Sequence, residues 1–199
     1  MSDLSRREFF DKEARGWDGR YHQDDESEIR KLVERFDLRP GDRILDVGTG
    51  NGFLLPHLLR RAGDTGKIVA LDFSWNMICE AAEIGKTEKV LFVNASVENL
   101  PIKDQTIDCV TCLATFAHVS GKREAISEAA RVLKKNGRLY ITHPMGKEEL
   151  AEHHRQVGEP VRNDTLPPDS EMIEMMKESG LKDVEIIDQH DLYLASARK

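Results

Sequence analysis

The fold is decided by the stretch Ile44-Leu45-Asp46-Val47-Gly48-Thr49-Gly50-Asn51-Gly52-Phe53. Its first four residues form a short, mostly apolar run typical of a buried strand, and a helical pattern begins at Gly52, the last of three alternating glycines. Glycine lets the backbone turn sharply and approach a ligand without Cβ obstruction, and a helix N-terminus presents unpaired N–H groups. Ligands of open α/β sheets bind at this end of the strands, so the stretch predicts a ligand site above the loop.

Two acidic residues near this loop indicate which kind of ligand it binds. The dinucleotide-binding pattern G-x-G-x-x-G fails because Phe53 replaces the last glycine, and no Gly-Lys-Ser/Thr follows the loop. Asp46 lies two residues before the first glycine, where a carboxylate repels pyrophosphate and attracts an ammonium or a sulfonium. Asp72 ends the next predicted strand, where it can accept both hydroxyls of a ribose.

The rest of the chain alternates short apolar runs with amphipathic stretches, as expected for a mostly parallel sheet covered by helices. The predicted strands are Arg43–Val47, Lys67–Leu71, Val90–Asn94, Ile107–Cys112 and Gly137–His143. The predicted helices are Gly52–Ala62, Ser74–Ile84 and Lys122–Val132, with further helices in residues 4–20, Glu28–Phe36 and Ser170–Ser179. Val184–Gln189 and Leu192–Ala197 are separated by a tight turn and must be antiparallel. We predict a Rossmann-like, doubly wound sheet of five parallel strands plus a C-terminal antiparallel hairpin.

Length and composition fit one soluble globular domain over residues 1–199. Hydrophobic residues make up 39% of the 199 residues, and 29 basic against 36 acidic residues give a net charge of -7. This acidic balance argues against nucleic-acid binding, which needs clustered basic side chains. No apolar run approaches the roughly 20 residues of a membrane span, and the charged N-terminus does not resemble a signal peptide. We expect a cytoplasmic protein.

Cys109 and Cys112 form a C-x-x-C sequence inside the apolar run 107–117. Positions i and i+3 of a strand point to opposite faces, so a buried strand is favoured over a redox or zinc site. The odd number of three cysteines fits a reducing compartment.

Four motifs in order resemble the class I S-adenosylmethionine-dependent methyltransferases, and most closely their small-molecule branch similar to ubiquinone/menaquinone-biosynthesis enzymes. The motifs are Asp46-Val47-Gly48-Thr49-Gly50-Asn51-Gly52, Asp72-Phe73-Ser74-Trp75-Asn76-Met77, Glu98-Asn99-Leu100-Pro101 with Thr106-Ile107-Asp108, and Ala129-Ala130-Arg131-Val132-Leu133-Lys134-Lys135-Asn136-Gly137. The resemblance covers residues 40–143 well and both ends more weakly. It implies residues 1–39 as a helical lid, 40–143 as the cofactor-binding core, and 144–199 as an acceptor-side cap with the closing hairpin.

The resemblance implies S-adenosylmethionine as cofactor and assigns its contacts. Asp46 would anchor the loop and the ammonium, Asp72 would hold the ribose, and the methionine part would lie against Gly48, Gly50 and Gly52. The adenine would lie between Phe73 and Val97, with Met77 and Leu113 as further contacts. Ser96 departs from the family, in which many relatives carry Asp to accept from the adenine amino group. A serine can still accept that bond, without charge assistance.

The sequence indicates fewer residues that would contact the methyl acceptor. His118 follows the fourth predicted strand and His143 ends the fifth. If residues 147–157 are helical, His154 turns inward with Leu150 and Val157 toward His143. A His143/His154 pair could act as base or acceptor contact, and packed neutral histidines are the alternative; no metal site is expected. The predicted acceptor contacts are His118, His143 and His154 with a lid of Phe10, Trp17 and Tyr21, whose alternative is packing on the sheet edge.

The sequence therefore predicts methyl transfer from S-adenosylmethionine to a small molecule, because residues 144–169 leave little room for a larger acceptor-recognition domain. A non-catalytic S-adenosylmethionine sensor or partner subunit is the alternative, since the same motifs would bind cofactor without turnover. A nicotinamide-dependent oxidoreductase is disfavoured by Phe53. The sequence is compatible with a homodimer and does not decide the oligomeric state.

Overall fold

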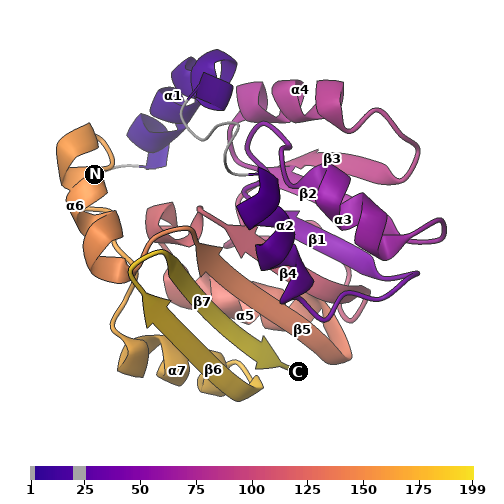
Figure 1. The fold of residues 1–199 in the computed structure, drawn as a ribbon. Helices are drawn as coiled ribbons and strands as arrows, with labels where there is room; N and C mark the ends of the chain where they lie inside the picture. The colour runs from indigo at the N-terminus through magenta and orange to yellow at the C-terminus, as the bar shows by residue number, and fades with distance from the viewer. Residues whose placement is uncertain (1–2, 20–25) are drawn as a thin grey trace.

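The computed structural model describes residues 3–19 and 26–199 and contains a seven-stranded sheet in the order β3-β2-β1-β4-β5-β7-β6 (Figure 1). The strands are β1 (Arg43–Val47), β2 (Lys67–Asp72), β3 (Val90–Asn94), β4 (Ile107–Leu113), β5 (Leu133–His143), β6 (Lys182–Gln189) and β7 (Leu192–Arg198). β1 to β5 pair in parallel, whereas β7 is antiparallel to both β5 and β6. The predicted Rossmann-like sheet with its C-terminal hairpin is confirmed.

Helices cover both faces of this sheet. They are α1 (Asp3–Glu13), α2 (Glu26–Glu34), α3 (Leu55–Ala62), α4 (Trp75–Ile84), α5 (Lys122–Val132), α6 (Lys147–Val157) and α7 (Asp169–Glu178), with short 3₁₀ helices η1 (Ala14–Gly19) and η2 (Phe116–His118). The apolar sides of α2 and α3 pack on one face, and those of α5 and α7 on the other. Consecutive strand residues point to opposite sides of the sheet, and helices cover both sides. Apolar side chains of the strands are therefore buried on both faces.

The two strand cysteines show this division. Cys109 is fully buried in the core beneath α2 and α3, whereas Cys112 is buried in the core beneath α5 and α7. Burial raises the pKa of both thiols, because a thiolate is poorly solvated in an apolar core. The expectation of a buried strand with the two cysteines on opposite faces is confirmed.

Two predicted boundaries are wrong for local backbone reasons. The helix after the glycine loop begins at Leu55, not at Gly52, because Gly52 has φ +90° and residues 51–54 form turns first. β5 begins at Leu133, four residues before the predicted Gly137. Asn136 has φ +64° and lies in a bulge inside the strand, between the pairs Ile107–Leu133 and Cys109–Arg138.

The elements near the two ends of the chain differ slightly from the predicted ones. The expected helix within residues 4–20 is divided into α1 and η1, and α2 ends two residues before Phe36. β6 begins at Lys182, two residues before the predicted Val184. Within residues 3–19 and 26–199, the helices are all too short or too polar to cross a membrane. The division into lid, core and cap stays a prediction.

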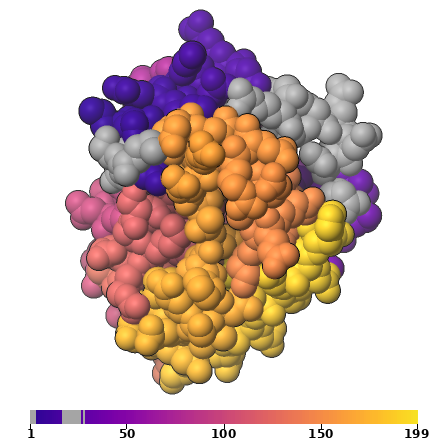
Figure 2. Space-filling view, turned by 90° about the vertical axis from the view of Figure 1, so that its left-hand side faces the viewer, coloured from indigo at the N-terminus to yellow at the C-terminus, as the bar shows by residue number. Residues whose placement is uncertain are grey.

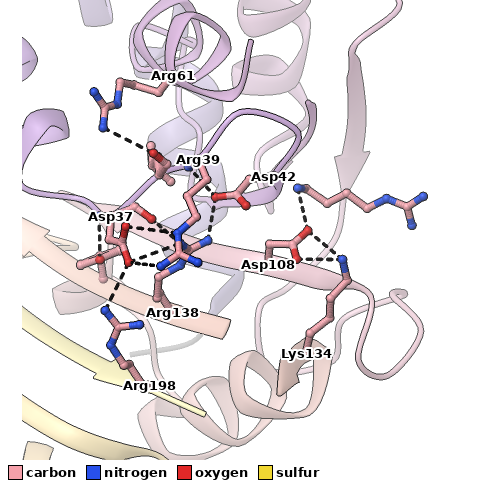
Figure 3. Close-up of polar contacts among 11 residues, drawn as sticks. Asp37, Arg39, Asp42, Arg61, Asp108, Lys134, Arg138 and Arg198 are labelled. Atoms are coloured by element: carbon pink, nitrogen blue, oxygen red, sulfur yellow. Dashed lines mark hydrogen bonds and ion pairs between the residues drawn. The ribbon is translucent and has the colours of Figure 1, made fainter. Parts of the chain in front are cut away.

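A buried ion pair lies at the amino-terminal end of β1, at the opposite end of the strand from the glycine loop (Figure 3). The guanidinium of Arg138, which is 4% exposed on β5, donates to Asp42 Oδ2 at 2.6 Å and to the carbonyl of Asp37. Asp42 also accepts from the backbone N–H of Arg39 at 2.9 Å. From β7, Arg198 reaches Asp37 Oδ2 at 3.2 Å. This cluster ties the turn before β1 to β5 and β7.

Removing Arg138 should therefore cost stability. Arg138→Ala leaves the Asp42 carboxylate buried without its cation, so we expect a loss of about 3–5 kcal/mol in the free energy of unfolding. Urea denaturation followed by circular dichroism measures this change. The control is Arg198→Ala, which removes a cation from the solvent-exposed rim of the same cluster and should leave the midpoint close to that of the unmodified chain. Equal effects of the two substitutions would contradict the assignment.

Candidate functional site

The glycine loop between β1 and α3 has an unusual backbone. Gly48, Gly50 and Gly52 all have positive φ, at +66°, +56° and +90°. A Cβ on Gly48 would overlap the side chain of Thr115, and one on Gly52 would approach the Cα of Ala81 to 2.9 Å. A Cβ on Gly50 would meet nothing within 4 Å. Two of the glycines therefore permit close packing within the protein, and the third leaves an open surface.

Asp72, at the end of β2, holds this loop from the side. Its Oδ2 accepts from Gly50 N at 2.9 Å, and its Oδ1 accepts from Ser74 N at 2.8 Å. The Ser74 hydroxyl in turn accepts from Met77 N and caps α4. Burial raises the pKa of Asp72 to about 6, against the lowering effect of the two backbone N–H donors. One carboxylate thus connects the glycine loop to the start of α4.

Asp46 lies in β1 beneath the same loop and is 1% exposed. The Thr111 hydroxyl donates to its Oδ1 at 2.9 Å. In the described part of the chain, Asp46 Oδ2 and the nearby Thr49 hydroxyl make no hydrogen bond of standard geometry, although Thr49 lies close enough to lower the pKa of Asp46 in part. Burial raises the pKa of Asp46 to about 6. A buried carboxylate oxygen without a partner suits a cationic or hydrogen-bond-donating ligand.

A cavity of about 360 Å³ opens at the carboxyl ends of β1, β2 and β4. Five residues predicted from the sequence line it: Gly48, Phe73, Ser96, Val97 and His118. Sequence analysis missed Thr115, which follows β4, and Glu98, whose carboxylate accepts from the Ser96 hydroxyl. A polar residue directly after a parallel strand is a usable signal for Thr115, because that position faces the ligand end of the sheet.

Helix α1 forms one wall of this cavity through Leu4 and Arg7. Phe10 is buried, with its ring edge-on to those of Phe73 at 5.7 Å and His118 at 5.1 Å between centroids. The carboxylate of Asp11 accepts from the Ser74 hydroxyl at 2.6 Å, and Arg7 donates to Asn94 at 2.9 Å. The structure thus places Phe10 beside the cavity. Trp17 belongs to η1, but its side chain, like all of Tyr21, lies outside the described residues.

The three predicted histidines come together but have different surroundings. His143 and His154 are buried, with ring centroids 6.5 Å apart. Neither ring nitrogen of His143 has a partner among the described residues, and burial lowers the pKa of His143 to about 3. His154 Nδ1 lies 2.6 Å from the carbonyl of Asp164, and burial lowers the pKa of His154 to about 4. His118 lines the cavity and bonds to the Asp164 carboxylate through Nδ1 at 2.9 Å.

Two predicted cofactor contacts lie in the core. Met77 is 2% exposed and packs with Phe10 and Ala14, and Leu113 is buried in the core beneath α2 and α3. Among residues 3–19 and 26–199, no three His, Cys, Asp or Glu side chains group so that they could hold a metal ion.

Comparison with known proteins decides the family. Residues 45–141 match the methyltransferase domain family. The ubiquinone/menaquinone biosynthesis C-methyltransferase UbiE of Enterobacter sp. (strain 638) is 32% identical over 188 residues, which cover 79% of this chain and 75% of that enzyme. The chain belongs to the class I S-adenosylmethionine-dependent methyltransferases.

Solved structures of methyltransferases share the fold. A methyltransferase in complex with the Trm112 activator of Haloferax volcanii has a TM-score of 0.75 at 22% identity, with 95% of this chain and 96% of that chain covered. A SAM-dependent methyltransferase from Aquifex aeolicus has a TM-score of 0.69 at 25% identity, with 85% and 88% covered. The chain spans about half the length of other curated UbiE enzymes that it matches. S-adenosylmethionine is the cofactor of this methyltransferase.

The glycine loop provides a matched pair of substitutions. Gly48→Ala combines a left-handed backbone with overlap against Thr115, so its unfolding free energy should fall by about 3 kcal/mol or more. Gly50→Ala meets only the backbone penalty of about 1–2 kcal/mol, because its surroundings are open. Chemical denaturation of both variants tests this order. A reversed order would mean that Gly48 does not pack against Thr115.

Proposed function

We propose that this methyltransferase transfers the methyl group of S-adenosylmethionine to a small molecule bound between the strand ends and α1. The observation that carries the proposal is the cavity of about 360 Å³, which lies against both the glycine loop and α1. Its size falls in the range of small-ligand sites, about 300–1,000 Å³. The named activity of the UbiE relatives, C-methylation in quinone biosynthesis, also supports a small acceptor.

The residues of the loop fit the cofactor that the family uses. The unpartnered Oδ2 of Asp46 suits the ammonium group, and the open face of Gly50 suits close approach of the methionine part. Each oxygen of Asp72 accepts a single backbone bond, so each keeps acceptor capacity for a ribose hydroxyl. Phe73 and Val97 line the cavity on the side we assign to the adenine, with Ser96 beside them. The cofactor supplies a methyl group activated by a sulfonium.

The protein's contribution to such a transfer is orientation. A methyl transfer from sulfonium is an in-line displacement, so the acceptor atom must lie opposite the leaving sulfur at close contact. Phe10 and His118 lie on the α1 side of the cavity, where an acceptor would meet the methyl group. Closure of the cavity by α1 would also exclude water from this contact.

The proposal is tested by following a labelled methyl group. The purified chain is incubated with methyl-labelled S-adenosylmethionine and a cell extract divided into small molecules, proteins and nucleic acids. We expect label in the small-molecule fraction, and its loss when excess S-adenosylhomocysteine competes for the site. Label confined to proteins or nucleic acids would overturn the small-molecule acceptor. Cofactor binding in a calorimeter with no label transferred to any fraction would instead favour the sensor.

A further inference from the structure

A second cavity lies away from the glycine loop, over β5, β7 and β6 and beside the end of α2. Its volume is about 370 Å³, and we call it the hairpin groove. In Figure 1, α2 lies in front of β1 and β4, whereas no helix of the described residues lies in front of β6 and β7. Figure 2 shows the orange segment around α6 against the yellow end of the chain, where Gly146 N donates to the carbonyl of His190 at 3.0 Å. Methyl transfer assigns no role to this groove.

The pairing of the three strands fixes the layout of the hairpin groove. Tyr140 of β5 pairs with Ser196 of β7, which pairs with Glu185 of β6. Two residues toward the start of β5, Arg138 pairs with Arg198 of β7. Residues two apart on a strand point to the same face, and neighbouring strands lie about 4.8 Å apart. The arginines therefore lie on the β5 and β7 side of the groove, and Glu185 lies about 10 Å from β5 on the far side.

The aspartates near the α2 end of the groove are already paired with arginines (Figure 3). Asp37 accepts from Arg39 Nη2 at 2.9 Å and from Arg198 Nη2 at 3.2 Å, and these bonds hold the pKa of Asp37 below its usual value. Asp42 accepts from Arg138 Nη2 at 2.6 Å. Three guanidinium groups thus compensate two carboxylates, so this end of the groove carries an excess of positive charge.

Two arginines of the groove keep donors for a ligand. Arg35 directly follows α2, is exposed, and forms no ion pair within the described residues. Arg138 is 4% exposed, and its Nε has no hydrogen-bond partner among residues 3–19 and 26–199. Buried polar groups are almost always paired, so an unused N–H on a buried guanidinium indicates capacity for a further acceptor. Phosphate and carboxylate groups are the acceptors that fit a guanidinium best.

The floor and the far side of the groove differ from its arginine end. Leu194 and Ile187 form an apolar floor, and the ring of Tyr140 is held by stacking on Phe36 at 4.6 Å between centroids. On the β6 side, Glu185 is exposed and forms no ion pair within the part of the chain that the structure describes. A ligand complementary to the groove therefore has an anionic end, an apolar middle and a cationic end.

We propose that the hairpin groove is a second ligand site, which binds an amphoteric small molecule with an aromatic or other apolar body. Arg35 and Arg198 hold its phosphate or carboxylate group. Leu194 and Ile187 contact its body, and Glu185 accepts from its amine. The volume of the groove falls in the range of small-ligand sites, about 300–1,000 Å³. The inference goes beyond the proposed function and does not depend on it, because the groove shares no lining residue with the cavity at the glycine loop.

Three simple compounds test the chemistry of this site. Each is titrated in a calorimeter into the S-adenosylhomocysteine complex, in which the cavity at the glycine loop is already filled. Tyramine phosphate has all three features, phenyl phosphate lacks the amine, and 4-(2-aminoethyl)benzoate has a carboxylate in place of the phosphate. Tyramine phosphate should bind about 3- to 5-fold more tightly than phenyl phosphate, and Glu185→Gln should remove this difference. The tighter of the two amine compounds shows whether the anionic group is a phosphate or a carboxylate.

Substitutions in the groove test its location. Arg35→Gln should weaken the binding of both phosphate compounds about 5- to 10-fold, because a charge-assisted hydrogen bond is lost. The matched control is Arg30→Gln, at an exposed arginine of α2 that does not line the groove, and it should leave the affinities unchanged. Ser196→Phe places a ring in the groove and should abolish binding. All of these variants should bind S-adenosylhomocysteine as the unmodified chain does, which shows that they are folded.

Three results would overturn the proposal. They are equal effects of Arg35→Gln and Arg30→Gln, undiminished binding by the Ser196→Phe variant, and no binding of any of the three compounds at millimolar concentration. A dimer of the unmodified chain in sedimentation that Ser196→Phe dissociates would also contradict it, because a second copy would then fill the groove. Failure of the proposed function is a separate result, since a chain that transfers no methyl label can still bind tyramine phosphate here.

Discussion

The site depends on one buried carboxylate that is shared by two backbone segments. Asp72 accepts from Gly50 N with one oxygen and from Ser74 N with the other. The first bond holds the glycine loop after β1 in its left-handed conformation, and the second fixes the first turn of α4. Ser74 then carries the connection to α1, because its hydroxyl donates to Asp11. A ligand that binds Asp72 therefore meets a loop, a helix start and a covering helix that are already in contact.

The residues at the other end of the strands stabilise the fold. Arg138, Asp42 and Asp37 fasten the turn before β1 to β5 and β7. Stability and cofactor binding are thereby separated along the strands: the buried ion pair lies at one end, and the glycine loop, its cavity and the histidines lie at the other. The ligand end has unpartnered buried polar atoms on Asp46 and His143, and the ion pair at the other end leaves Arg138 Nε without a partner as well, all within the described residues.

The sequence predicts the central fold well because its signals are local. The bounds of β1 and β3 match the prediction, and the inward turn of His154 toward His143 follows from helical spacing in residues 147–157. Val157, predicted to lie on the same inward face, is instead exposed because it is the last residue of α6. The start of α3 was missed because Phe53 and Leu54 continue an apolar pattern that does not reveal the φ of Gly52. The contact of Arg6 with Asp164 joins positions 158 residues apart, one in α1 and the other in the loop between α6 and α7. No spacing rule brings these side chains together, so the orientation of His118 needed the structure.

The central claim is that Asp72 binds the cofactor as an ionised carboxylate, and calorimetric titration with S-adenosylhomocysteine tests it most directly. Because burial raises the pKa values of Asp72 and Asp46 to about 6, affinity should be full above that pH and fall as the pH decreases through it. At pH 7.5, Asp72→Asn should weaken binding by about 1–3 kcal/mol, whereas Asp108→Asn, at the far edge of the sheet, should leave it unchanged. A folded Asp72→Asn protein that binds as tightly as the unmodified chain would contradict the account.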